Sequence, residues 1–190
     1  SFEGLASYFT VNISSPNTPG LRALQNKAEL ETLVTRVMQA RKGRTPILLK
    51  IAPDLTDEEL ADIAAVALER GLDGLIVSNT TIRREGFVSG PHSNETGGLS
   101  GQPLFALSTE VLRTMYRLTG GKIPIVGVGG VSSGADAYAK IRAGASAVQL
   151  YTALTYDGPM LVSRIKRELA LLLAADGIEH LRDAVGLDAR

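Results

Sequence analysis

The amino-acid sequence predicts an α/β protein made of repeated βα units, specifically about the last five units of a (β/α)8 barrel. Short apolar segments alternate with helical segments along the whole chain, which is the pattern of a parallel sheet. Polar clusters follow the apolar segments at their carboxyl ends, which converge on one face of a parallel barrel. A doubly wound sheet is the alternative, but no glycine-rich fingerprint directly follows the first strand to support it.

The elements can be placed in order along the chain. The expected strands lie near residues 7–12, 46–51, 73–78, 123–128 and 146–151. Between Lys27 and Arg41 apolar residues recur at helical spacing, which gives that helix one face for packing on the sheet. Thr56 and Glu59 have the spacing of a capping box, so a second helix is expected to begin there.

The ends of the later helices are also predicted. The last helix is expected from about Pro159 to Ala174, with Val162 among its inward-facing residues and Gly177 at its end. Four glycines separate a helical segment from the next strand, and each is expected to adopt the left-handed conformation that ends a helix. They are Gly43, Gly71, Gly120 and Gly144.

Composition restricts the possible functions. The 190 residues are 44% hydrophobic, with 20 basic and 20 acidic residues, which is typical of a soluble globular domain. A net charge of zero without a basic stripe disfavours nucleic acid as a partner. The chain has no cysteine, and its two histidines, His92 and His180, lack metal-ligand spacing, so we expect no disulfide and no metal site. The chain does not begin with methionine, and we expect it to be a piece of a longer protein.

A polar loop follows the first strand at Asn12–Leu21. It contains two amides and three hydroxyls, stiffened by two prolines, and this composition suits the binding of a small polar molecule. A turn with a helix cap is the simpler interpretation of the loop taken alone. Ser78–Thr81 repeats the combination of amide and hydroxyl after another strand. Two such sets facing each other could bracket a planar ring with alternating N–H and C=O groups, and Glu95–Gly101 would add backbone donors.

A glycine-rich loop, Gly127–Gly134, follows the fourth strand and leads into a helix. Glycines there let backbone N–H groups approach a phosphate, and the start of the helix adds favourable dipole charge. Tyr151 and Thr152, at the end of the next strand, could complete the phosphate site. The alternative is a glycine-rich turn that serves only tight packing.

Lys50 ends an otherwise apolar strand, where a cation needs a partner. The anion of a ligand is one candidate partner. The alternatives are a lysine that extends to solvent or one that pairs with Asp54. The long segment 82–105, rich in glycine and serine, also suggests a functional loop.

Six motifs together resemble the dihydroorotate dehydrogenase family, over nearly all 190 residues. They are Asn12–Thr18, Leu49–Asp54, Ser78–Thr81, Glu95–Gly101, Gly127–Gly134 and Gln149–Thr152. The resemblance implies the C-terminal portion of a single FMN-binding (β/α)8 barrel domain. It also implies oxidation of (S)-dihydroorotate to orotate in pyrimidine (UMP) biosynthesis.

The resemblance implies roles for individual residues. Ser15 would be the base that removes the C5 proton while hydride passes from C6 to the flavin, and we expect it to relay the proton to water or to Thr18. The substrate contacts would be Asn12, Asn17, Asn79 and Thr80. The FMN contacts would be Asn12, Lys50, Ser78, Gly101, Gly130, Tyr151 and Thr152, with the last three around its phosphate and Lys50 beside its ring.

The serine at position 15 resembles class 2 members, which pass electrons to a membrane quinone, whereas class 1 members have cysteine there. The earlier barrel strands, a substrate-binding lysine and the helices of the quinone entrance have no counterpart in these residues. We therefore expect peripheral attachment, through that missing part, to an inner membrane, preferably on the bacterial cytoplasmic face, and no turnover by the 190 residues alone. A second copy could close the open sheet. The rival interpretations are another FMN barrel oxidoreductase acting on a dihydropyrimidine, or a flavin-free fragment without activity.

Overall fold

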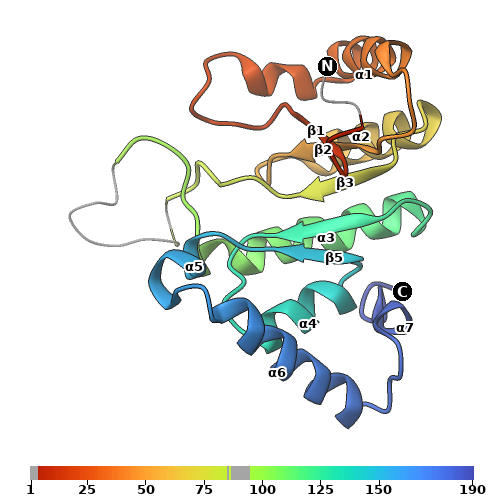
Figure 1. Cartoon of the computed structure of the whole chain (residues 1–190). Coiled ribbons are helices and arrows are strands. Elements are labelled where there is room, and N and C mark those ends of the chain that lie inside the picture. The colour runs from red at the N-terminus through yellow and green to blue at the C-terminus, as the bar shows by residue number, and fades with distance from the viewer. Residues whose placement is uncertain (1–3, 85, 87–94) are drawn as a thin grey trace.

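The computed structural model describes residues 4–84, 86 and 95–190, and its strands form one parallel sheet of five (Figure 1). The strands are β1 (Phe9–Asn12), β2 (Ile47–Ile51), β3 (Gly74–Val77), β4 (Ile125–Val128) and β5 (Ala147–Gln149). They pair in the order of the chain, β1-β2-β3-β4-β5. A doubly wound sheet reverses its strand order at a switch point, so pairing in chain order excludes that alternative for the described residues.

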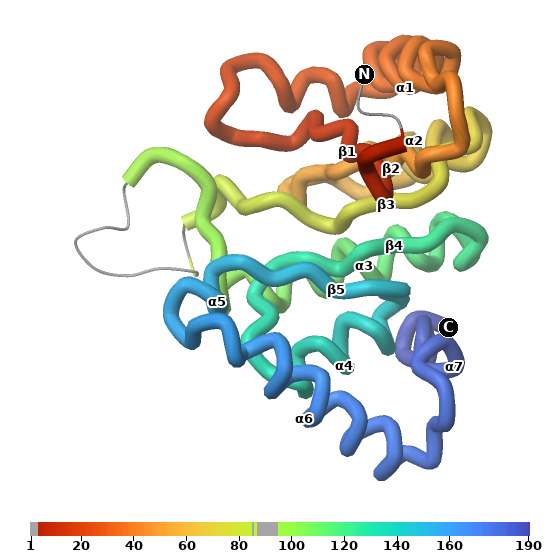
Figure 2. Tube along the Cα trace, viewed as in Figure 1, coloured from red at the N-terminus to blue at the C-terminus, as the bar shows by residue number. Residues whose placement is uncertain are grey.

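The helices follow the strands in regular alternation. Two 3-10 turns, η1 (Leu21–Gln25) and η2 (Gln102–Leu104), precede α1 (Lys27–Ala40) and α3 (Phe105–Thr119). The other helices are α2 (Asp57–Glu69), α4 (Gly134–Arg142), α5 (Thr152–Asp157), α6 (Leu161–Ala175) and α7 (Leu181–Ala184). Figure 2 follows the chain around a curved sheet, with α1 to α4 on its outer side and α6 beyond α4. The short elements η1, η2, α5 and α7 are absent from the sequence prediction.

The core lies between the outer face of the sheet and the helices. In β2 the burial alternates, so that Ile47, Leu49 and Ile51 are buried while Leu48 and Lys50 are only partly covered. The buried residues pack against α1 and α2 through side chains such as Leu30 and Ile63. Because side chains of a strand alternate between faces, Lys50 must lie on the inner face, away from the helices.

Most predicted helix ends are confirmed. The Thr56 hydroxyl accepts a hydrogen bond from Glu59 N–H at 3.3 Å, and the Glu59 carboxylate accepts one from Thr56 N–H at 2.8 Å, which completes the capping box of α2. Gly71, Gly120 and Gly144 have positive φ angles of 68°, 61° and 120°.

Two details of the prediction are wrong. Gly43 is not in the left-handed conformation, because α1 ends at Ala40 and extended Arg41 is held instead by an ion pair with Asp73 at 3.0 Å. Val162 is 44% exposed, because α6 begins at Leu161 and buries the face that carries Leu161 and Ile165. Among the described residues, the helices are too short or too polar for any of them to cross a membrane.

We expect Thr56→Ala to lower the free energy of unfolding by about 1 kcal/mol, because it removes the cap of α2. Urea unfolding followed by circular dichroism measures the change. Thr32→Ala is the matched control, since Thr32 is exposed within α1 and its hydroxyl only bonds the Ala28 carbonyl of its own helix. An equal loss of unfolding free energy in both variants would show that the Thr56 hydroxyl does not stabilise α2 as its cap.

Candidate active site

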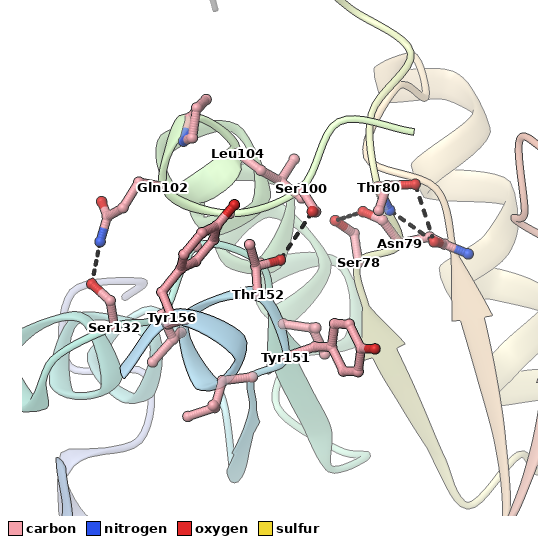
Figure 3. Close-up of a pocket in the computed structure, with 18 of the residues that line it drawn as sticks. Ser78, Asn79, Thr80, Ser100, Gln102, Leu104, Ser132, Tyr151, Thr152 and Tyr156 are labelled. Carbon is pink, nitrogen blue, oxygen red and sulfur yellow. Dashed lines mark hydrogen bonds between the residues drawn. The ribbon is translucent and has the colours of Figure 1, made fainter. Parts of the chain in front are cut away.

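A cavity of about 640 Å³ opens at the carboxyl edge of the sheet (Figure 3). Its walls come from β2 and β4, from the segments that follow β3, β4 and β5, from α5 and from the residues before α3. Eight of the residues predicted from the sequence line it: Lys50, Ser78, Asn79, Thr80, Gly101, Gly130, Tyr151 and Thr152. Figure 3 shows the Ser78–Thr80 group on one side and Thr152, hydrogen-bonded to Ser100, on the other.

The register of the sheet places the predicted polar residues next to one another. Asn12 of β1 lies opposite Lys50 of β2, and Ile51 lies opposite Val77, directly before the Ser78–Thr81 segment. Asn79 continues this alignment, since its N–H donates to the Ile51 carbonyl at 2.9 Å. The two amide-bearing segments therefore lie at the same edge on either side of Lys50.

The two amide sets contact each other directly. Asn79 Nδ2 donates to Ser14 Oγ at 3.1 Å and lies 3.4 Å from Asn12 Oδ1, while Ser14 Oγ donates to Asn12 Oδ1 at 2.9 Å. The Asn79 amide oxygen accepts from Thr80 N–H at 2.8 Å. These bonds fix both amide planes, and the Asn12 NH₂ group makes no hydrogen bond to another described residue, so it can serve as a donor.

Ser15 lies beside this network on the loop after β1. Its hydroxyl oxygen accepts a hydrogen bond from Asn17 N–H at 3.3 Å, and its side chain is half-buried. Asn17 extends toward the later loop, where its Oδ1 lies 3.5 Å from the position that a Cβ on Gly97 would take. Asn12, Ser15 and Asn17 do not themselves line the cavity, so the structure places them next to it, Asn12 at the end of β1 and the other two on the loop that follows.

Arg22, which the sequence interpretation missed, joins the three loops. Its guanidinium donates to the Ser14 carbonyl at 3.1 Å, to the Thr80 carbonyl at 2.9 Å and to the Asp54 carboxylate at 2.8 Å. Asp54 also accepts from the Thr81 hydroxyl and from Ile82 N–H. One partly buried ion pair thus fixes the loops after β1, β2 and β3 relative to one another. No local pattern signals this role, because the partners are distant in sequence.

Lys50 has no such partner. Asp54 pairs with Arg22 and Arg83, so the alternative of a Lys50–Asp54 pair is excluded. Within residues 4–84, 86 and 95–190, no carboxylate forms an ion pair with Lys50. Burial lowers the pKa of its ammonium group below the ordinary value. A half-buried cation that faces the cavity and forms no ion pair among the described residues is a group suited to an anionic or electron-rich ligand.

Glycines form the opposite wall of the cavity. Gly130 has a φ of 76°, and a Cβ there would lie 2.5 Å from Phe105 Cβ. Gly101 has a φ of 81°, and a Cβ there would lie 3.2 Å from Thr152 Cγ2. Only glycine satisfies both the backbone conformation and the contact at these positions. The wall therefore presents backbone groups to a ligand.

The start of α4, predicted to favour a phosphate, is already occupied by the protein's own carboxylates. Gly134 N–H donates to the Glu168 carboxylate at 2.6 Å, and Ser132 N–H donates to Asp136 at 3.0 Å. A phosphate bound here would therefore be restricted to groups before and beside the helix. The N–H groups of Gly129 and Gly130 make no hydrogen bond to the backbone of the described residues.

The lining of the cavity suits a ligand that has a polar ring and an anionic group. Its volume is within the range of cofactor pockets. Glycine N–H groups suit a phosphate, and Lys50 with the two asparagines suits a polar ring. His92 and part of the predicted segment 82–105 lie outside the described residues.

Comparison with known proteins agrees with this arrangement. A sequence model described as dihydroorotate dehydrogenase matches residues 1–173. The chain belongs to the dihydroorotate dehydrogenase family. It is 78% identical over 188 residues to a dihydroorotate dehydrogenase (quinone) of Parvibaculum lavamentivorans, covering 99% of this chain and 54% of the relative. It is 57% identical over 193 residues to the mitochondrial dihydroorotate dehydrogenase (quinone) of Arabidopsis thaliana, covering 97% of this chain and 42% of the relative.

A solved dihydroorotate dehydrogenase structure confirms the fold class. The Eimeria tenella enzyme in complex with ferulenol superposes with a TM-score of 0.91 at 46% identity, covering 97% of this chain and 55% of the other. The parallel sheet with alternating helices is therefore that of the TIM barrel fold of dihydroorotate dehydrogenases. The chain spans about half the length of the curated relatives it matches.

Arg22→Ala should destabilise the protein by roughly 2–3 kcal/mol, because it leaves the Asp54 carboxylate, 10% exposed, with only the longer ion pair to Arg83 at 3.6 Å. Hydrogen exchange should also accelerate in peptides covering residues 13–18 and 79–82. Arg41→Ala is the control, since it breaks the Arg41–Asp73 pair at the opposite edge of the sheet. Unchanged exchange in both loops of the Arg22 variant would show that the ion pair does not hold them.

Proposed function

We propose that the protein serves the FMN-dependent oxidation of (S)-dihydroorotate to orotate, with a quinone as electron acceptor, in pyrimidine biosynthesis. The observation that carries the proposal is the half-buried Lys50, which forms no ion pair with the described residues and lies between the amide network and the glycine wall of one cavity. The names of the relatives, dihydroorotate dehydrogenase (quinone), support the same reaction. Serine at position 15 supports the quinone-dependent class.

Several residues of the cavity would hold FMN. Gly130, Tyr151 and Thr152 would surround the phosphate, and Thr152 is already fixed by its bond to Ser100 at 2.9 Å. Gly101, Ser78, Asn12 and Lys50 would contact the rest of the cofactor. Bound FMN would accept two electrons from the substrate and release them to the quinone.

The amides would orient the substrate. Dihydroorotate carries ring N–H and C=O groups in alternation, and an asparagine side chain pairs with both kinds. Asn12 and Asn79 are held by their mutual contacts, which lowers the cost of ordering them on binding. Asn17 and Thr80 would complete the contacts from the loops after β1 and β3.

Ser15 would act as the base at the substrate's C5 position. Its oxygen accepts a hydrogen bond from Asn17 N–H, and such a bond stabilises negative charge that develops on the oxygen. The proton would pass on to water or to Thr18. Closing the site against bulk water strengthens these contacts.

We further propose that these residues are the C-terminal portion of one FMN-binding barrel domain. The quinone would then reach the flavin through a part of the protein outside these residues, which would also provide peripheral attachment to an inner membrane. Supporting this, the relatives include bacterial and mitochondrial enzymes of about twice this length.

The test uses the natural protein, purified from the cells that produce it. Its absorbance spectrum is recorded in the absence of oxygen. We expect bound flavin that dihydroorotate bleaches and a soluble quinone restores. The same titration on the 190 residues expressed alone shows whether they suffice for FMN binding. A colourless protein that takes up no FMN in either form would contradict the proposal and support an inactive fragment. Flavin bleached by another dihydropyrimidine, but not by dihydroorotate, would favour a different oxidoreductase.

Ser15→Ala should slow the bleaching of bound flavin by dihydroorotate about 10²–10⁴-fold, the usual contribution of a general base. FMN affinity should stay within about threefold, because Ser15 does not line the cavity. Stopped-flow absorbance measures the rate, and Ser146→Ala, an exposed serine before β5, is the control. A parallel loss of bound FMN would instead make Ser15 a structural residue.

Lys50→Ala should make the bound flavin harder to reduce even without substrate, because a positive charge beside the cofactor is lost. The potential should fall by tens of millivolts, with ~30 mV for each 1.4 kcal/mol of lost stabilisation. Spectroelectrochemical titration measures it, with Lys122→Ala, exposed at the amino end of β4, as the charge-matched control. An unchanged potential in the Lys50 variant would place this lysine away from the ring.

A further inference from the structure

A second lysine, Lys140 of α4, lies behind the glycine wall and is fully buried. Its ammonium nitrogen donates to Ser108 Oγ at 2.6 Å and lies 5.0 Å from the centroid of the Phe105 ring. Within the described residues, no carboxylate forms an ion pair with it. Burying an ammonium group without a counter-charge is costly, so this arrangement requires an explanation.

The residues that contact Lys140 also lie against the glycine-rich loop, Gly127–Gly134. Ser108 Oγ lies 3.2 Å from the Gly129 carbonyl oxygen. Phe105, whose ring faces the ammonium group, is also the residue that a Cβ on Gly130 would strike. Lys140 Cβ itself lies 3.4 Å from the position of a Cβ on Gly127. The ammonium group therefore lies directly behind Gly127–Gly130, on the side opposite the cavity.

We propose that Lys140 is the buried counter-charge of the phosphate group bound by this loop, and that it makes the site select a phosphate-bearing flavin over riboflavin. The inference rests on the proposed function, since it requires a flavin in the cavity. Lys140 touches neither ligand nor reacting atoms, so it acts through charge and through the Ser108 contact to Gly129.

The surroundings of Lys140 allow its amine to gain a proton when the phosphate binds. Burial lowers its pKa to about 7, and Asp136, one turn earlier on α4, acts weakly in the opposite direction. From α6, Glu168 and Arg164 face the start of α4, but they engage each other and Gly134 N–H. From α3, the neighbours Phe105 and Ser108 are uncharged. A dianion near the loop would raise the pKa of Lys140, so binding at pH 8 would take up a proton.

The first experiment compares FMN and riboflavin by fluorescence titration. In Lys140→Met, which keeps an unbranched apolar chain, the preference for FMN should fall on the order of tenfold, as expected for one charge acting at a distance through the protein. Riboflavin affinity should stay within about twofold, because riboflavin has no phosphate. Lys122→Met, exposed at the amino end of β4, is the charge-matched control and should change neither affinity.

The second experiment needs no variant at Lys140. Calorimetric titration at pH 8 in Tris and in HEPES gives the protons bound per ligand, and FMN, whose phosphate is already a dianion there, should take up roughly half a proton or more. Riboflavin should take up none. Because it uses the unaltered protein, this measurement decides the matter even if Lys140→Met fails to fold.

An unchanged preference for FMN in a folded Lys140→Met variant, or no proton uptake by the unaltered protein, would overturn the role of Lys140 while leaving flavin binding intact. Binding of neither flavin would instead overturn the proposed function, and this inference with it.

Discussion

The parallel pairing of five strands in chain order is the constraint on which the site depends. Because every strand points the same way, each loop that follows a strand reaches the same edge, whatever its distance along the chain. The register aligns Asn12 with Lys50 and continues through Ser78, so groups from three separate segments meet at one edge of the sheet. Each loop contains common polar residues, and the parallel sheet brings the loops together into one site.

The inner and outer faces of the sheet differ in polarity. The outer face is apolar and packs under the helices through residues such as Leu49, while the inner face carries Lys50 and opens at the carboxyl edge. Alternation along one short strand thus provides both a core contact and a charged group. This division explains why an otherwise apolar segment tolerates a cation at its end.

The sequence predicts those features that depend on local chemistry. The strands, the capping box at Thr56 and the glycine-rich wall follow from spacing and from backbone preferences, and the structure contains them. Gly43 shows the limit: its position suggested a left-handed residue, but a distant ion pair between Arg41 and Asp73 ends the helix differently. Arg22 and Lys140 were not predicted for the same reason, since Asp54 and Ser108, their side-chain partners, each lie 32 residues away in the chain.

Three cationic side chains near the carboxyl edge differ in their ion pairing, and this difference indicates the charge of the ligand that the cavity binds. Arg22 is neutralised by Asp54 and works as a fixed structural link. Lys50 and Lys140 are placed on two sides of the cavity wall and form no ion pair with a carboxylate of the described residues, although the chain has as many acidic as basic residues. Acidic side chains are therefore available, and without an ion pair to one of them each protonated lysine places a positive potential within low-dielectric surroundings. The desolvation cost of that potential is offset only when a ligand supplies the negative charge, which favours an anionic cofactor over a neutral one.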